Sequence, residues 1–432
     1  MSYDHFIIME VGADVGLIRA RRRAQGRDRS GSLETLSADE ILVARPRGVP
    51  VSDYVSIAVT NDRKTALDAS RDPAKIVARN MPVTLIEPVK ATDFGIEAVP
   101  RDPMADAKAT GLSWGIADVL GRSPRDLDGA GVKVAVLDTG IDPNHAAFAP
   151  IREAIISKRR NFSNGKDDDV NGHGTHCAGT IFGRDVEKVR IGVARGVTEV
   201  LIGKVLGDDG FGSTKSVLDA LTWAHSEGAN IISMSLGFDF PKMQKNLMTQ
   251  GNPPELATSI ALRSYRENLR QFETLANLLM QENEDSPGTV IVAAAGNESR
   301  RNLNPNFVID VSIPAAAARG IVSVGATWPV LSGLQGIAPF SNINPQLCAP
   351  GVGIVSAARG GGLRPDDGTS MACPHVAGVA ALWWGWMRDR NQGVVRATDV
   401  ASQLTATARD TVFEPDVTFG DRGAGAVLAP QQ

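Results

Sequence analysis

Short apolar segments that alternate with helical patterns constrain the fold of this chain more than any other feature. Val132–Leu137 and Val200–Leu206 are almost wholly apolar, as expected of strands that are buried on both faces. Asn230–Ser235 and Val290–Ala295 are similar, and the helical pattern up to Glu227 begins at Ser213, a favourable N-cap residue. This alternation predicts an α/β fold, with a doubly wound, mostly parallel sheet and helices on both faces.

Three short strings place reactive side chains in this pattern. They carry Asp138, His173 and Ser370, and read Val134-Ala135-Val136-Leu137-Asp138-Thr139-Gly140, then Asn171-Gly172-His173-Gly174-Thr175-His176-Cys177-Ala178-Gly179, then Gly368-Thr369-Ser370-Met371-Ala372-Cys373-Pro374-His375. In this order they resemble the subtilase family of serine peptidases. The resemblance covers roughly residues 110–430 and implies a subtilisin-like peptidase domain over residues 106–432.

The resemblance gives each of these side chains a role. Ser370 is a weak nucleophile until a base removes its proton, and His173 is that base. Asp138 holds the imidazole and stabilises its protonated form. Asn297, in Ala293-Ala294-Ala295-Gly296-Asn297-Glu298, resembles the asparagine that binds the oxyanion together with the Ser370 backbone N–H. Without the other motifs, an Asn after Gly would be read as a turn residue.

Two glycine-containing segments resemble those that pair with an extended peptide in the family, and a third resembles a wall of the pocket for the residue before the cleaved bond. The expected substrate-binding residues are Gly210, Phe211 and Gly212, Ser235, Leu236 and Gly237, and Ala294 and Gly296. Ordinary glycine-rich loops are the alternative. Small residues in the wall imply room for a sizeable apolar side chain.

Residues 1–105 differ in character from the rest. Phe6–Val11, Val51–Thr60 and Val83–Val89 look like strands, and Asp72–Asn80 looks like a short helix. This small α+β pattern resembles the inhibitory and folding-assisting propeptide of the family, which implies self-cleavage between about Ala91 and Ser113. A permanently attached domain of unrelated role is the alternative. The arginine-rich stretch 19–29 is interpreted as a solvated loop.

Two further segments complete the organisation of the chain. Ala91–Pro124 is polar and dotted with proline, as a linker is. Phe238–Pro287 is an insertion about 20 residues longer than the family usually has, and it contains the strong helical pattern Pro254–Asn283. This helix either covers ordinary core or forms a wall near the substrate cleft.

Composition narrows the function classes. Of 432 residues, 43% are hydrophobic and 22% charged, which are globular values, and the net charge of −4 argues against a nucleic-acid binder. Three cysteines form no disulfide or zinc framework, which favours a reducing compartment. Met1–His5 lacks a basic segment and Glu10 interrupts the apolar run after it, so we expect no secretory signal and a cytoplasmic protein, with export by another route left open. The apolar pattern Val376–Met387 is too short to span a bilayer and predicts a core helix.

No cofactor is expected to be required. Asp167–Asp169 is interpreted as a solvated acidic turn, with a structural calcium site as the alternative. His176 lies three residues after His173, but no Glu completes a zinc-peptidase pattern. Cys177 and Cys373 are expected to be small buried hydrophobes, and His375 to be structural.

The sequence therefore predicts a serine endopeptidase that hydrolyses polypeptides through an acyl-enzyme. We expect it to be made as a zymogen inhibited by its own N-terminal domain, with no nucleic-acid or membrane partner. A catalytically silent pseudopeptidase that only binds peptides is the alternative outside the enzymes.

Overall fold

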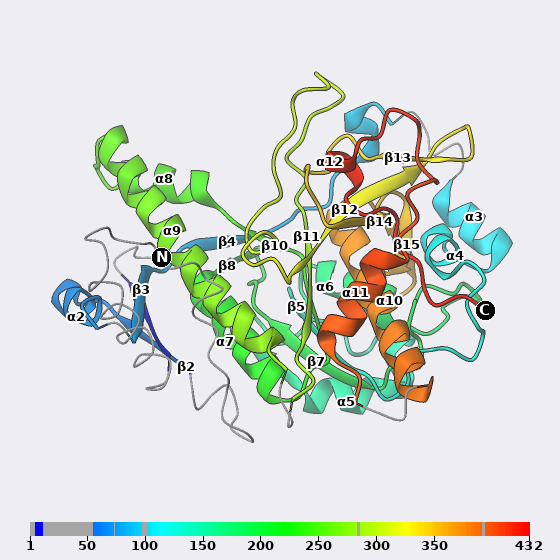
Figure 1. The fold of residues 1–432 in the computed structure, drawn as a ribbon, viewed down its shortest axis with the longest axis horizontal. Helices are drawn as coiled ribbons and strands as arrows, with labels where there is room; N and C mark the ends of the chain where they lie inside the picture. The colour runs from blue at the N-terminus through cyan, green and yellow to red at the C-terminus, as the bar shows by residue number, and fades with distance from the viewer. Residues whose placement is uncertain (1–4, 12–54, 73, 97–101, 283–285, 391–393) are drawn as a thin grey trace, which may run out of the picture.

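A computed structural model shows the chain from one end to the other (Figure 1). It describes residues 5–11, 55–72, 74–96, 102–282, 286–390 and 394–432. The arginine-rich stretch 19–29 and the first residues of the predicted strand Val51–Thr60 lie outside the described residues.

Within the described residues the central sheet has eight strands, and the predicted α/β fold is confirmed. Their order is β13-β12-β11-β9-β5-β7-β6, with β14 also paired to β12, and every pairing is parallel except that of β12 with β13. The bounds are β5 Lys133–Asp138, β6 Arg159–Asn161, β7 Glu199–Lys204, β9 Ile231–Met234, β11 Val290–Ala294, β12 Val322–Pro329, β13 Gln335–Ile337 and β14 Leu347–Pro350. The apolar strands of the sequence are thus the middle of the sheet.

Successive residues of these strands enter two different apolar cores. In β5, Val134 and Val136 belong to the larger core, whereas Ala135 and Leu137 belong to the second one. The larger core includes helices α4 (Trp114–Leu120), α6 (His173–Phe182), α10 (Thr369–Arg390) and α11 (Ala397–Ala406), and the second includes α7 (Thr214–Ser226) and α9 (Pro254–Met280). Because side chains alternate across a strand, a sheet covered on both sides needs such unbroken apolar runs.

The N-terminal region forms its own antiparallel sheet in the order β2-β1-β3. It comprises β1 Phe6–Val11, β2 Val55–Thr60, β3 Lys75–Arg79 and the helix α2 Arg63–Ala69. The predicted helix Asp72–Asn80 is wrong, because most of that segment is the strand β3. The helix begins earlier, where the side chain of Asp62 accepts hydrogen bonds from the N–H groups of Lys64 and Thr65 and caps it.

The N-terminal sheet lies against helix α9, and Ile7, Met9, Val11 and Val55 belong to the second core (Figure 1). Two buried amide side chains of α9 also bind its backbone. Gln271 donates from Nε2 to Ile7 O (3.1 Å) and Ile76 O (2.8 Å), and Asn268 donates from Nδ2 to Arg79 O (2.7 Å). The insertion helix therefore holds the N-terminal sheet as well as covering the core.

The segment expected to be a plain linker contains helices. They are the 3₁₀ helix η3 Ala91–Phe94, α3 Pro103–Thr110 and α4, where Asp102 caps α3 by accepting from the N–H groups of Met104 and Ala105. Phe94 is buried and packs edge-on against Phe340 at 5.4 Å between ring centroids. Proline and polar residues here mark helix starts rather than an unstructured connection.

The remaining elements frame the site or close the fold. The insertion contains a second helix that the sequence did not predict, α8 Phe240–Thr249, whose first turn is capped by Asp239. The others are η4 Ala146–Ile151, α5 Arg152–Ser157, β15 Ile354–Ala357, β16 Leu363–Asp366 and α12 Phe419–Arg422.

Among the described residues, no helix is both long and apolar enough to span a membrane.

A small third sheet joins the two regions. The strand β4 (Pro82–Leu85) lies antiparallel between β8 (Phe211–Ser213) and β10 (Leu236–Phe238). In Figure 1 it runs from the N-terminal region into the body of the molecule. A segment of the N-terminal region thus occupies the space between the two segments that were expected to bind substrate.

Candidate active site

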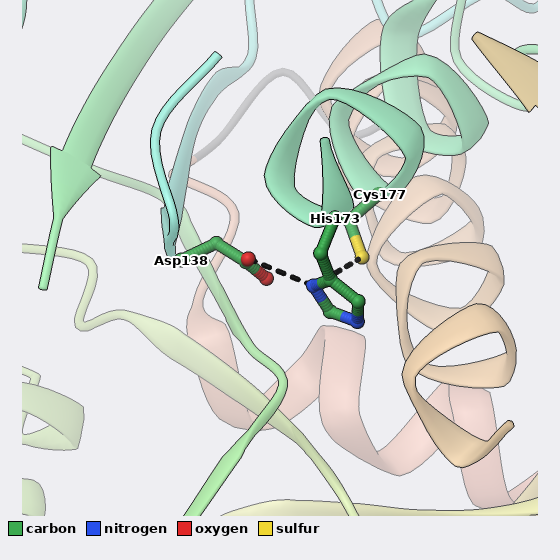
Figure 2. Close-up of side chains that lie close together, drawn as sticks. All are labelled: Asp138, His173 and Cys177. Atoms are coloured by element: carbon green, nitrogen blue, oxygen red, sulfur yellow. Dashed lines mark hydrogen bonds and ion pairs between the residues drawn. The ribbon is translucent and has the colours of Figure 1, made fainter. Parts of the chain in front are cut away.

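Asp138 and His173 meet where a strand ends and a helix begins. Asp138 is the last residue of β5, His173 is the first of α6, and both side chains are buried. The distance from His173 Nδ1 to Asp138 Oδ1 is 2.8 Å (Figure 2). Close contact between these elements requires glycine, because a Cβ on Gly174 would lie 2.2 Å from the carbonyl oxygen of Gly140.

A second carboxylate fixes this junction. Asp169 is buried, and its oxygens accept hydrogen bonds from Thr139 Oγ1 (2.9 Å), Gly172 N (2.8 Å), Thr175 N (2.9 Å) and Thr175 Oγ1 (2.7 Å). The sequence analysis placed Asp169 only in a solvated acidic turn. The hydroxyl of Thr175, in the helix that follows, was the available signal that Asp169 has a buried hydrogen-bonding partner. Asp168 pairs with Arg159, and Asp167 accepts from Asn161 Nδ2 at 3.1 Å. Calcium binding here stays a prediction.

The Asp138 carboxylate sets the protonation of His173. Burial of the imidazole by itself lowers its pKa, but the charge of Asp138, its hydrogen bond and the neighbouring Cys177 together raise the pKa of His173 well above 6.5. His173 Nε2 is buried and has no hydrogen-bond partner within the part of the chain that the structure describes. The nitrogen that would accept a proton is thus unengaged in this arrangement.

Cys177 connects His173 to the start of α10. Its Sγ lies 3.7 Å from His173 Nδ1 and donates to the carbonyl oxygen of Ser370 at 3.4 Å. Across the described ranges, Asp138, His173 and Cys177 are the one close group of three side chains able to ligate a metal. Burial raises the pKa of the Cys177 thiol, so it is a protonated, poor ligand, as expected for a small buried hydrophobe. Cys373 is similar, with its pKa raised to about 12 by burial.

Ser370 lies in the first turn of α10 and faces the N-terminal segment. Its Oγ donates a hydrogen bond to the carbonyl oxygen of Ile86 at 2.9 Å, and Ser370 is fully buried. Ile86 and Glu87 follow β4 directly and lie in the predicted strand Val83–Val89, which was interpreted as part of the propeptide-like region. No local signal in the sequence told which of its peptide bonds would reach Ser370.

The Asn297 side chain is oriented by the residue before Ser370. Its Oδ1 accepts from the N–H and the hydroxyl of Thr369, both at 2.9 Å, which fixes the amide so that Nδ2 points outward. Asn297 Nδ2 donates to the carbonyl oxygen of Glu87 at 2.9 Å. Gly296 supports the same arrangement by donating from its N–H to Thr369 Oγ1 at 3.1 Å, and Ala294 lies buried in β11.

The two expected peptide-binding segments both pair with β4. Thr84 is opposite Phe211 on one side and Gly237 on the other, while Val83 is opposite Gly212 and Leu85 is opposite Leu236. Leu85 N donates to Gly210 O at 2.9 Å, and Ile86 N donates to Ser235 O at 3.3 Å. All six residues therefore contact an extended peptide through the backbone, and that peptide belongs to the same chain.

The remaining histidines of the motifs have structural partners. His176 Nε2 donates to Ile354 O at 2.9 Å, and His375 Nδ1 donates to Met371 O at 2.8 Å. Burial lowers the pKa of each imidazole to about 4, so both are neutral. His375 is structural, as predicted.

Comparison with known proteins agrees with this geometry. The sequence profile of the subtilase family matches residues 129–422. The chain belongs to the subtilase family. It is 30% identical to an alkaline protease of Alkalihalobacillus alcalophilus over 82% of this chain and 84% of that protein. It is 31% identical to M-protease of Shouchella clausii over 77% of each chain, and 30% identical to the major intracellular serine protease of Bacillus subtilis over 65% of this chain and 76% of that protein. This subtilase is a serine endopeptidase that acts on polypeptides.

Proposed function

We propose that this subtilase hydrolyses peptide bonds with Asp138, His173 and Ser370, aided by Asn297, and that it is made self-inhibited by its N-terminal region. The observation that carries the proposal is the position of β4. Backbone groups on both sides bind it, and its next residue, Ile86, accepts a hydrogen bond from Ser370 Oγ.

The chemistry follows from the groups present. When a substrate replaces Ile86, the Ser370 hydroxyl gives its proton to His173 Nε2 as Oγ forms a bond to the carbonyl carbon. Asn297 and the Ser370 N–H stabilise the charge on the carbonyl oxygen. His173 then gives the proton to the departing amine as the peptide bond breaks, and water hydrolyses the acyl-enzyme in the same manner. Asp138 stabilises the charged imidazole throughout.

The N-terminal segment is bound in a geometry that does not favour its own cleavage. Attack requires the nucleophile and the oxyanion donor to address the same carbonyl group. Here Ser370 Oγ contacts the oxygen of Ile86, whereas Asn297 contacts that of the next residue, Glu87. Both carbonyls lie upstream of the range Ala91–Ser113 in which self-cleavage is predicted. The segment thus acts as an inhibitor that fills the cleft without being positioned for attack.

Two alternatives predict different outcomes. A pseudopeptidase would bind β4 and substrates but hydrolyse neither, and the intact Asp138–His173 pair does not favour it. A permanently attached N-terminal domain would leave the chain both whole and active.

The three cysteines are buried and form no disulfide. The cytoplasmic location, which the cysteine content favoured, stays a prediction.

The test compares the wild-type chain with Ser370→Ala. Wild type is expected to hydrolyse a fluorogenic peptide and to react with a fluorophosphonate, and the variant to do neither while keeping the same circular dichroism and melting temperature. Unchanged hydrolysis in Ser370→Ala would refute the assignment. Intact mass and N-terminal sequencing of both proteins test inhibition, because a full-length, fully active wild type contradicts an inhibitory N-terminal region.

A further inference from the structure

The insertion encloses one side chain of the segment that runs through the cleft. Met81 is buried together with Met243 and Leu247 of α8 and Ala257 and Ala261 of α9. Phe240, Ile260 and Tyr265 pack at the margin of this group. We call these seven helix residues the Met81 pocket. All are uncharged, and the helices are joined by a hydrogen bond from Gln244 Nε2 to Thr258 Oγ1 at 2.6 Å.

Hydrogen bonds hold the backbone of the segment as far back as Met81. They are made to its backbone N–H and C=O groups, so they do not depend on the side chains of the bound peptide. Met81 N donates to Thr214 Oγ1 at 3.1 Å, and Met81 O accepts from Thr214 N at 3.0 Å. The next carbonyl, that of Pro82, accepts from Asp239 N at 3.1 Å. Thr214 directly follows β8, so this backbone recognition continues without a break from the site at Ser370 to the insertion.

We propose that the Met81 pocket is a substrate subsite that selects a large apolar side chain with no branch at Cβ, such as Met or Leu. The selected residue lies five positions before the one whose carbonyl reaches Ser370. The proposal rests on the proposed function, because a substrate must take the place of residues 81–86. Binding of an apolar side chain in this buried pocket is favourable in proportion to the apolar area that it removes from water. A charged side chain bound there would lose its hydration without gaining a partner. Remote contacts of this kind contribute to kcat/KM as well as to binding.

The first test uses a matched set of fluorogenic peptides with the full-length chain. Each peptide has the sequence Asn-X-Pro-Val-Thr-Leu-Ile followed by an aminomethylcoumarin leaving group, with Met, Leu, Ala or Asp at X. Occupation of the cleft by β4 lowers all rates by the same factor and cancels in their ratios. Met and Leu should give a kcat/KM about 10- to 100-fold above Ala, with Asp lowest. Equal rates for Met, Ala and Asp would overturn the proposal.

The second test changes the pocket itself. Ala261→Leu fills it from helix α9, so the preference for Met over Ala should fall to about one or reverse, because overpacking penalises the larger side chain. Leu262→Ala is the matched control, since Leu262 is exposed on the same helix, and its ratios should equal those of wild type. An unchanged preference in Ala261→Leu would contradict the assignment of the pocket.

Failure of the pocket and failure of the proposed function are distinguishable. If no peptide is hydrolysed, Met included, either by the full-length chain or after a cut between Ala91 and Ser113, the proposed function fails, and the pocket is then judged without activity. Amide hydrogen exchange at Leu85 and Ile86 is compared in the full chain carrying Ser370→Ala with Met81→Leu or Met81→Asp. Protection should survive Met81→Leu and be lost in Met81→Asp. Equal protection in both would overturn the pocket as a site of apolar recognition.

Discussion

Gln271 offers a direct test of how the N-terminal region is held over the cleft. Its side chain is fully buried on α9 and donates two hydrogen bonds to backbone carbonyls of the N-terminal sheet, at Ile7 and Ile76. Gln271→Ala removes both donors. Each buried hydrogen bond contributes about 1 kcal/mol net, so the loss is about 2 kcal/mol, more where the carbonyls stay unsatisfied. Because about 1.4 kcal/mol corresponds to a factor of ten, the open fraction should rise about 30-fold.

The substitution should leave the peptidase domain itself intact. Alanine is a good helix former, and within the described residues the amide of Gln271 donates only to the N-terminal sheet. Gln271→Glu is a sharper variant of similar shape, since it turns a carboxylate toward two carbonyl oxygens and should open the cleft further. Arg270→Ala is the control, because its side chain is exposed on the same helix.

The assay is the initial rate of hydrolysis of a fluorogenic peptide by full-length chains that intact mass shows to be uncut. The rate of Gln271→Ala should exceed that of wild type by about 30-fold, with Arg270→Ala equal to wild type. Amide exchange in β1 and β3 should speed up in parallel. Wild-type rates and wild-type exchange in both Gln271 variants would refute the reasoning, because α9 would then not be what holds the N-terminal sheet.

The remaining predictions concern the reacting groups. Asn297→Ala should lower kcat by roughly 100-fold or more with little change in KM. This magnitude is the one known for such a donor in the family. A raised KM with unchanged kcat would instead place Asn297 in ground-state binding. Protonated His173 cannot accept the Ser370 proton, and its pKa is raised, so kcat/KM should fall with decreasing pH with a midpoint above 6.5. Asp138→Asn removes the charge that raises this pKa, so the midpoint should move to lower pH while kcat falls by about 10⁴-fold; a midpoint that stays in place would show that Asp138 does not set it.

The parts of the fold that were predictable from sequence are those with a strong local pattern. The central strands were found because burial on both faces leaves an unbroken apolar run, and Ser213 was found because it caps α7 by accepting from Ser216 N. The strand Lys75–Arg79 was missed because its character comes from pairing with β1, which is 65 or more positions away in sequence. Short strands of this kind depend on partners more than on their own residues.

The same distinction applies to the site. Asp138, His173, Ser370 and Asn297 stand in local strings that the sequence displays openly. The contact of Ser370 with Ile86 joins residues 284 positions apart, and no spacing rule indicates which carbonyl would arrive there. The role of α9 was likewise ambiguous, because an apolar helix face predicts burial without naming what it buries against.

The strand β4 is continuous in one polypeptide with β8 and β10, which flank it. Under the proposed inhibition, its competition with a substrate is intramolecular, at an effective concentration that for short connections is about millimolar and does not change with the amount of protein. Dilution of the intact chain should leave β4 in its place, and a substrate at micromolar concentration should displace it only rarely. A single cut between β4 and α4 changes this, because the released segment then leaves at a rate set by its own affinity and returns at a rate set by its concentration.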